Sequence, residues 1–239
     1  ELYAANCFRI EGLKRANILG PARRLLGETA AVLPSGQRPL ELRILEAGLD
    51  LSDQMVDAGS PIRCLTSGED GLLVTGSEDG VIRVWGDRPL RMVATISADL
   101  GPLSHLAVSP DGNLLLAAGQ SGTARLWRTA DWHPVATLEG HTKPLDVARF
   151  DPGGRVVATA SADGTARLWD AASGAVLHRF GGEPEAAGLR MPAACFDHQG
   201  QRLLTGRSDG TITIWDLPSG RRLAVTPPVG STLYGLAVA

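Results

Sequence analysis

The chain has 239 residues, enough for one large domain or two small ones, and its 29 glycines in a composition that is 44% hydrophobic indicate a folded, turn-rich β protein. Lysine and arginine total 23 against 26 aspartates and glutamates, and the net charge of −3 lacks the positive excess that binding to nucleic-acid phosphates needs. A helix that spans a bilayer needs about 18–20 uncharged apolar residues. No stretch of this sequence approaches that length, so we expect no membrane segment in this chain.

Residues 1–48 are predicted to form a short helical connector. Apolar and aromatic residues recur at spacings of 4, 3 and 3 along one helical face: Tyr3, Cys7, Ile10 and Leu13. Gly20-Pro21 then ends this helix and begins a second one, because proline is favoured in the first turn of a helix. A short third helix is expected over residues 40–47.

A repeat of about 42 residues organises the chain from about residue 59 onward. Four tryptophans recur in phase, at spacings of 42, 42 and 46: Trp85, Trp127, Trp169 and Trp215. Each ends a short apolar run typical of a strand, such as TITIW before the last one. An Asp-Gly or Ser-Gly pair precedes each run and predicts a tight hairpin turn, because glycine tolerates positive φ.

Each repeat is predicted to contain four antiparallel strands. A strand–turn–strand pattern such as ARFDPGGRVVATAS comes before the tryptophan run, and a further apolar run such as PVATL follows it. Sheets that are apolar on both faces must stack, and radial stacking gives a β-propeller. We therefore expect an all-β fold, a partial ring of four complete blades plus the first strand of a fifth, preceded by the helical segment. The expected blades span about 59–98, 101–139, 143–181 and 190–227, and the additional strand 231–239.

The third repeat carries the most complete set of repeat motifs: Gly140-His141, Ser161, Asp163-Gly164 and Trp169-Asp170. With these motifs the chain resembles the WD-repeat β-propeller family over residues 59–239. The resemblance implies a structural network in which the Trp indole bonds the Ser hydroxyl, the Ser bonds the His, and the His bonds the turn Asp. The implied members here are Trp169, Ser161, His141 and Asp163. The other repeats lack the histidine, so we expect one complete network of four.

Two catalytic interpretations compete with the structural one. His141, Ser161 and Asp163 are the side chains of a Ser/His/Asp nucleophilic site, but the implied network accounts for all three. Residues 206–210 fit the GxSxG pattern of a hydrolase, but that pattern needs a helix after it and TITIW predicts a strand. We therefore predict that the chain is no enzyme and binds no cofactor and no metal. The dispersed cysteines are expected to be reduced, buried thiols: Cys7, Cys64 and Cys195.

The family resemblance implies a scaffold that binds protein or peptide ligands. Family contact positions near the start of each first strand, with their neighbours, give a candidate partner-binding face: Ser104, Lys143, Asp146, Arg190, Pro192 and Tyr234. Arginines also recur two residues before three of the tryptophans, at positions 83, 125 and 167. They either form an anion-binding ribbon or, as we favour, pack their stems along the blades.

The LYAAN start, a Gly-Pro-Ala break and a later Leu-Glu-Leu-Arg are similar to the helical connector before WD repeats in bacterial serine/threonine kinases. This implies an alternative function, as the sensor arm of a bacterial signalling protein, a kinase or nucleotide-driven switch, whose effector domain lies upstream. Glu at position 1 and the unfinished fifth blade predict a fragment of a larger protein. We expect its location to be cytoplasmic. Such an open stack would expose an apolar sheet face at each end and tend to aggregate.

Overall fold

The computed structural model describes residues 58–68, 72–87, 90–182 and 188–230. The chain divides into two compact units, of which residues 58–86 and 92–239 make up the second. This second unit holds the repeats. The predicted helices within residues 1–48 and the predicted strand at 231–239 lie outside the described residues.

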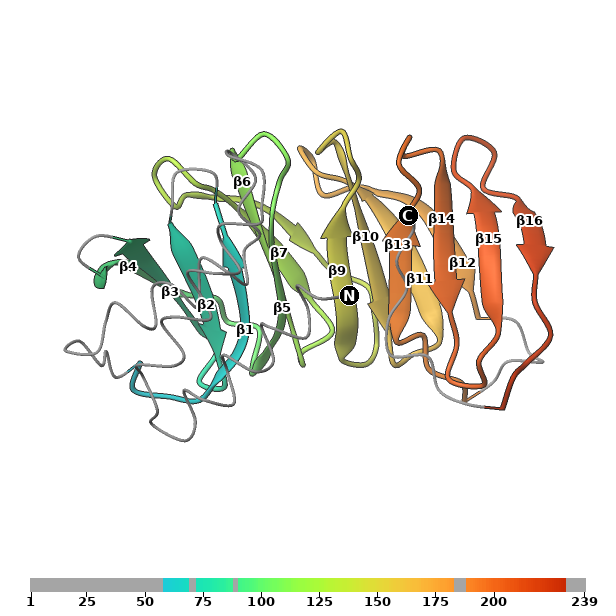
Figure 1. The fold of residues 1–239 in the computed structure, drawn as a ribbon, viewed down its shortest axis with the longest axis horizontal. Helices are drawn as coiled ribbons and strands as arrows, with labels where there is room; N and C mark the ends of the chain where they lie inside the picture. The colour runs from blue at the N-terminus through green and yellow to red at the C-terminus, as the bar shows by residue number, and fades with distance from the viewer. Residues whose placement is uncertain (1–57, 69–71, 88–89, 183–187, 231–239) are drawn as a thin grey trace, which may run out of the picture. The chain divides into compact units, whose positions relative to one another are not determined.

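The described residues form four four-stranded antiparallel sheets, each with its strands in chain order (Figure 1). The first contains β1 (Ile62–Ser67), β2 (Leu73–Ser77), β3 (Val81–Asp87) and β4 (Leu90–Ser97). The second contains β5 (Leu103–Val108), β6 (Leu114–Gly119), β7 (Ala124–Arg128) and β8 (Pro134–Leu138). The third contains β9 (Leu145–Phe150), β10 (Val156–Ser161), β11 (Thr165–Asp170) and β12 (Val176–Gly181). The fourth contains β13 (Ala193–Phe196), β14 (Arg202–Gly206), β15 (Ile212–Asp216) and β16 (Arg222–Val225).

The Asp-Gly and Ser-Gly pairs lie in the turns between the second and third strands of each sheet. Glycines of these pairs also lie against the backbone of the neighbouring repeat. Gly164 has a φ of 81°, a region that side chains with a Cβ rarely adopt. A Cβ on Gly164 would lie 2.6 Å from the carbonyl oxygen of Leu189, which belongs to the loop before the next sheet. Gly122 is in the same situation, with the Lys143 carbonyl oxygen 2.9 Å from its virtual Cβ. These turns therefore allow neighbouring repeats to pack closely.

Three hydrophobic cores lie between consecutive sheets rather than inside any one of them. Along β6, Leu115 and Ala117 join the core shared with the first sheet, while Leu116 and Ala118 join the core shared with the third. This division follows from the alternation of side chains along a strand. The in-phase tryptophans at 127, 169 and 215 each pack in the core shared with the preceding sheet. No repeat could bury these faces alone, so the stacking itself stabilises the fold.

The first strands of successive sheets adjoin one another, so β1 contacts β5, β5 contacts β9 and β9 contacts β13. Convergence on the first strand is the arrangement of blades in a β-propeller. The four blades expected from the repeat are thus present as four sheets.

The face of the fourth sheet that points away from the third sheet is less buried than the equivalent face of the third sheet. Leu204 and Ile214 are half-buried, whereas their counterparts Ala158 and Leu168 are 1% and 3% exposed. The third sheet's face is covered by the fourth, which explains the difference. Aggregation of the isolated chain stays a prediction.

Candidate functional site

The third sheet contains a chain of hydrogen bonds that begins at its tryptophan and ends at the β10–β11 turn. The Trp169 indole Nε1 donates to Thr159 Oγ1 over 2.8 Å, and Thr159 Oγ1 lies 2.8 Å from His141 Nε2. His141 Nδ1 in turn lies 2.9 Å from Asp163 Oδ2. An ionised Asp163 carboxylate only accepts, so His141 carries its proton on Nδ1 facing Asp163. Nε2 of the neutral imidazole then accepts from the Thr159 hydroxyl, which itself accepts the indole N–H.

The prediction that Ser161 accepts the indole N–H was wrong, because Thr159 takes that place. Both residues point to the same face of β10, two positions apart. In the β10–β11 register Trp169 pairs with Val157, and Thr159 pairs with Arg167. Thr159 is therefore the diagonal neighbour of Trp169, while Ser161 is about 7 Å farther along the strand.

Ser161 instead fixes the loop before β9. Its Oγ lies 3.0 Å from both the Lys143 and the Pro144 carbonyl oxygens, to which the hydroxyl donates, and it accepts the Asp163 N–H over 3.0 Å. The hydrogen-bond partners of its hydroxyl among the described residues are all backbone groups, so His141 and Ser161 do not form the nucleophile–base pair that a hydrolase would need.

The charges in this network follow from burial. Burial lowers the pKa of His141, and its hydrogen bond with Asp163 only partly opposes this effect. Burial would raise the pKa of Asp163, but hydrogen bonds from Thr165, His141 and the Thr142 N–H outweigh it and lower that pKa to about 2. A neutral His141 therefore donates to an ionised Asp163 at neutral pH, a charge-assisted hydrogen bond.

The threonine partner recurs in two other repeats and was missed by the sequence interpretation. Trp85 donates to Thr75 over 2.8 Å, and Trp215 donates to Thr205 over 2.9 Å. Each threonine lies ten residues before its tryptophan, a recurrence that marks the position but does not show which hydroxyl the indole reaches. The second repeat has Ala117 at this position, which offers no hydroxyl.

The recurrent arginines all form hydrogen bonds or ion pairs with groups close to their own sheets. Arg83 donates to Ser77 over 2.8 Å and pairs with Asp79 at 2.7 Å. Arg125 donates to the Ala98 carbonyl over 2.9 Å, and Arg167 donates to the Gly140 carbonyl over 2.7 Å. These contacts support the packing interpretation over the anion-binding ribbon, because each guanidinium holds a loop or turn.

The GxSxG segment lies in a hairpin turn, and the strand β15 follows it, as the sequence predicts. The Ser208 hydroxyl accepts the Arg190 N–H over 3.1 Å, and the Ser208 N–H donates to the Arg190 carbonyl over 3.0 Å. Ser208 thus anchors the loop before β13 rather than standing at a strand-to-helix elbow.

The candidate partner-binding face is brought together in part. Asp146 Oδ1 and Arg190 NH2 form an ion pair at 2.5 Å between the third and fourth sheets. Lys143 is exposed in the loop that Ser161 holds. Ser104 Oγ donates to the Ala118 carbonyl over 3.2 Å within its own sheet. Pro192 is half-buried just before β13, and Tyr234 lies outside the described residues.

Two further predictions concern cysteines and membranes. Cys64 and Cys195 are free thiols, half-buried and buried respectively, whereas Cys7 is outside the described ranges. Burial raises the pKa of the Cys64 thiol to about 11. The part of the chain that the structure describes contains no helix long and apolar enough to cross a membrane.

The four-stranded sheets stack with their first strands adjoining, and in three of them a Trp–Thr hydrogen bond links the second and third strands. This arrangement defines a repeat protein of the β-propeller class. The family model described as WD domain, G-beta repeat matches residues 54–86, 91–128, 132–170 and 192–216. The chain therefore belongs to the WD-repeat family, which confirms the resemblance inferred from its motifs. No curated protein matches the chain.

Proposed function

We propose that this chain is a protein-interaction scaffold that binds a protein or peptide ligand at the edge where the first strands begin. The observation that carries the proposal is the Asp146–Arg190 ion pair, which joins two blades at this edge. The Arg190 side chain is 57% exposed and the Asp146 side chain 18%, so a ligand reaches chiefly the Arg190 guanidinium.

The loops that present this edge are held by backbone hydrogen bonds. Ser161 binds the carbonyls of Lys143 and Pro144, and Ser208 binds the N–H of Arg190. A surface fixed before binding loses little conformational entropy when a ligand docks. In such folds the rigid strands hold the loops in place, and the loops contact the ligand.

The chemistry of the edge favours a ligand that donates hydrogen bonds. Asp146 Oδ2 is buried and has no hydrogen-bond partner among the described residues, although Oδ1 is paired. A ligand N–H or basic side chain reaches this oxygen once the Asp146 side chain turns outward on binding, and the new charge-assisted hydrogen bond then favours the complex. The place of this scaffold in a larger signalling protein and its cytoplasmic location stay predictions.

Selection of peptides from a displayed random library on the purified chain, followed by calorimetry, tests the proposal. Asp146→Asn and Arg190→Ala are expected to weaken binding of the selected peptides by about tenfold or more. Arg221→Ala, which changes an exposed arginine in the turn before β16, is the matched control and should leave affinity unchanged. Selected peptides that bind both edge variants as tightly as the unchanged chain would contradict this site.

A further inference from the structure

A second candidate site lies at the opposite end of the first strands. Two adjoining pockets of about 300 Å³ each share three lining residues, Pro110, Arg149 and Phe150. One extends past β5 to Thr66 on β1, and the other extends to Cys195 and the turn after β13. The residues lining the two pockets come from or follow the first strands of all four sheets, β1, β5, β9 and β13, and we call this combined surface the groove.

Arg149, near the end of β9, is the positive charge at the centre of this groove. It is exposed, and no ion pair or hydrogen bond of its guanidinium is formed with the described residues. This contrasts with Arg83, Arg125 and Arg167, whose guanidinium groups all have partners. An unpaired guanidinium offers several donors to an anionic group.

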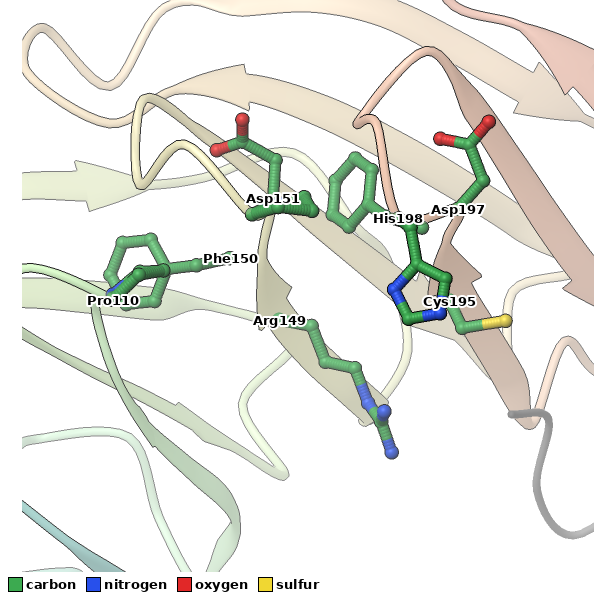
Figure 2. Close-up of a pocket in the computed structure, with 9 residues that line it drawn as sticks. Pro110, Arg149, Phe150, Asp151, Cys195, Asp197 and His198 are labelled. Atoms are coloured by element: carbon green, nitrogen blue, oxygen red, sulfur yellow. The ribbon is translucent and has the colours of Figure 1, made fainter. Parts of the chain in front are cut away.

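The two carboxylates that line the groove do not neutralise Arg149. Asp151 Oδ1 accepts the Val156 N–H over 2.8 Å, and Asp197 Oδ1 accepts the Gln201 N–H over 2.7 Å, so both cap their turns. Figure 2 shows both carboxylates directed to one side and the Arg149 guanidinium to the other. The groove therefore keeps an unopposed cation.

The remaining titratable groups leave Arg149 as a positive site at neutral pH. Burial, and then the charge of Arg149, lower the pKa of His105 to about 4, so its imidazole is neutral. Burial raises the pKa of the Cys195 thiol, which therefore stays protonated. His198 is exposed and lines the same pocket as Arg149 and Cys195 (Figure 2).

We propose that this groove binds an extended acidic peptide of a partner protein, with a glutamate or aspartate carboxylate on Arg149. Apolar residues beside the carboxylate pack against Pro110, Phe150 and Phe196, which line the same groove. Each pocket of about 300 Å³ alone is at the small end of the range for compact ligands, about 300–1,000 Å³, whereas an extended chain can occupy both neighbouring pockets.

This site is independent of the proposed edge. Asp146 and Arg149 lie three residues apart on β9, and therefore about 10 Å apart along the strand. Binding at one end does not require the groups at the other, so one proposal can fail without the other.

The test uses fluorescence anisotropy with two labelled pools of short peptides on the full chain. In the first pool glutamate and aspartate alternate with apolar residues, and in the second the same positions carry glutamine and asparagine. We expect the acidic pool to bind at least about tenfold more tightly, and Arg149→Gln to remove this preference. Arg221→Gln is the matched control and should preserve it.

A competition experiment tests whether the groove recognises a peptide or any small anion. Inorganic phosphate and free glutarate at equal anion concentration are expected to displace the acidic pool much less well than an unlabelled peptide does. Equal binding of the two pools, an unchanged preference in Arg149→Gln, or displacement by phosphate as effective as by peptide would each overturn the proposal.

Discussion

The Thr159 hydroxyl stands between the Trp169 indole and the His141 imidazole, 2.8 Å from a nitrogen of each. Trp169 is 1% exposed and the His141 side chain is fully buried, so neither polar group has water as an alternative partner. One hydroxyl thus satisfies a donor on β11 and an acceptor in the loop before β9.

Thr159→Val is expected to lower the free energy of unfolding by about 1–3 kcal/mol, because it keeps the side-chain shape but leaves buried polar groups unpaired. Urea unfolding followed by tryptophan fluorescence measures this. Thr137→Val changes an exposed threonine of β8 and is the matched control, with little expected effect. Equal stability of the two variants would contradict the role given to Thr159.

His141→Ala is expected to lower the thermal midpoint, because the variant removes the donor to Asp163 and the acceptor for Thr159. Ligand binding at the Asp146–Arg190 edge should remain mostly intact, since that edge uses other side chains. Differential scanning calorimetry and the peptide titration measure the two effects separately. An unchanged midpoint would refute the structural role of this histidine.

Stability is expected to fall with acidity below about pH 6.5. The folded-state pKa of His105 is lowered to about 4 and that of His141 is also lowered, so the unfolded chain binds more protons between about pH 6.5 and 4. The stabilisation is fully present above pH 6.5 and is lost as the pH falls. Asp163, with a pKa lowered to about 2, adds a loss in the same direction below about pH 4.

The pH effect is measured by urea unfolding at several values between pH 7.5 and 4.5. His105→Gln should flatten part of the dependence, because it removes one of the two groups with a lowered pKa. An unfolding free energy that is independent of pH across this window would show that neither imidazole is buried as described.

Gly164→Ala is expected to destabilise the chain by more than about 1 kcal/mol, since φ is positive and the new Cβ would meet the Leu189 carbonyl at 2.6 Å. Gly68→Ala is the matched comparison, because Gly68 has no heavy atom within 4 Å of its virtual Cβ and no positive φ. Thermal unfolding of the two variants should rank them clearly. A neutral Gly164→Ala would mean that the adjacent repeat does not pack on this turn.

The Asp146–Arg190 pair is expected to contribute less than about 1 kcal/mol to stability, because Arg190 is 57% exposed and solvent screens the pair. A double-mutant cycle with Asp146→Asn and Arg190→Gln measures the coupling. A small coupling in stability together with a large loss of peptide binding would assign the pair to recognition. A large coupling would instead make it part of the fold.

The repeat, the four-stranded blades and the family could all be predicted from the sequence, because the signals involved are local. Asp163-Gly164 and the runs on either side of it specify a hairpin within about a dozen residues. The His141–Asp163 contact also followed from the family resemblance. The choice between Thr159 and Ser161 could not be read in this way, because both are small hydroxyl residues on the same face of β10.

The sequence by itself determined the strands, the turns and the period, since alternation and turn chemistry act between neighbouring residues. Only the tertiary structure decided which hydroxyl meets Trp169, because that depends on the register of β10 against β11. It also decided that Asp146 meets Arg190 across 44 residues, and that Arg149 stands unpaired between two pockets. Those relationships arise from the packing of one blade on the next, which no single repeat encodes.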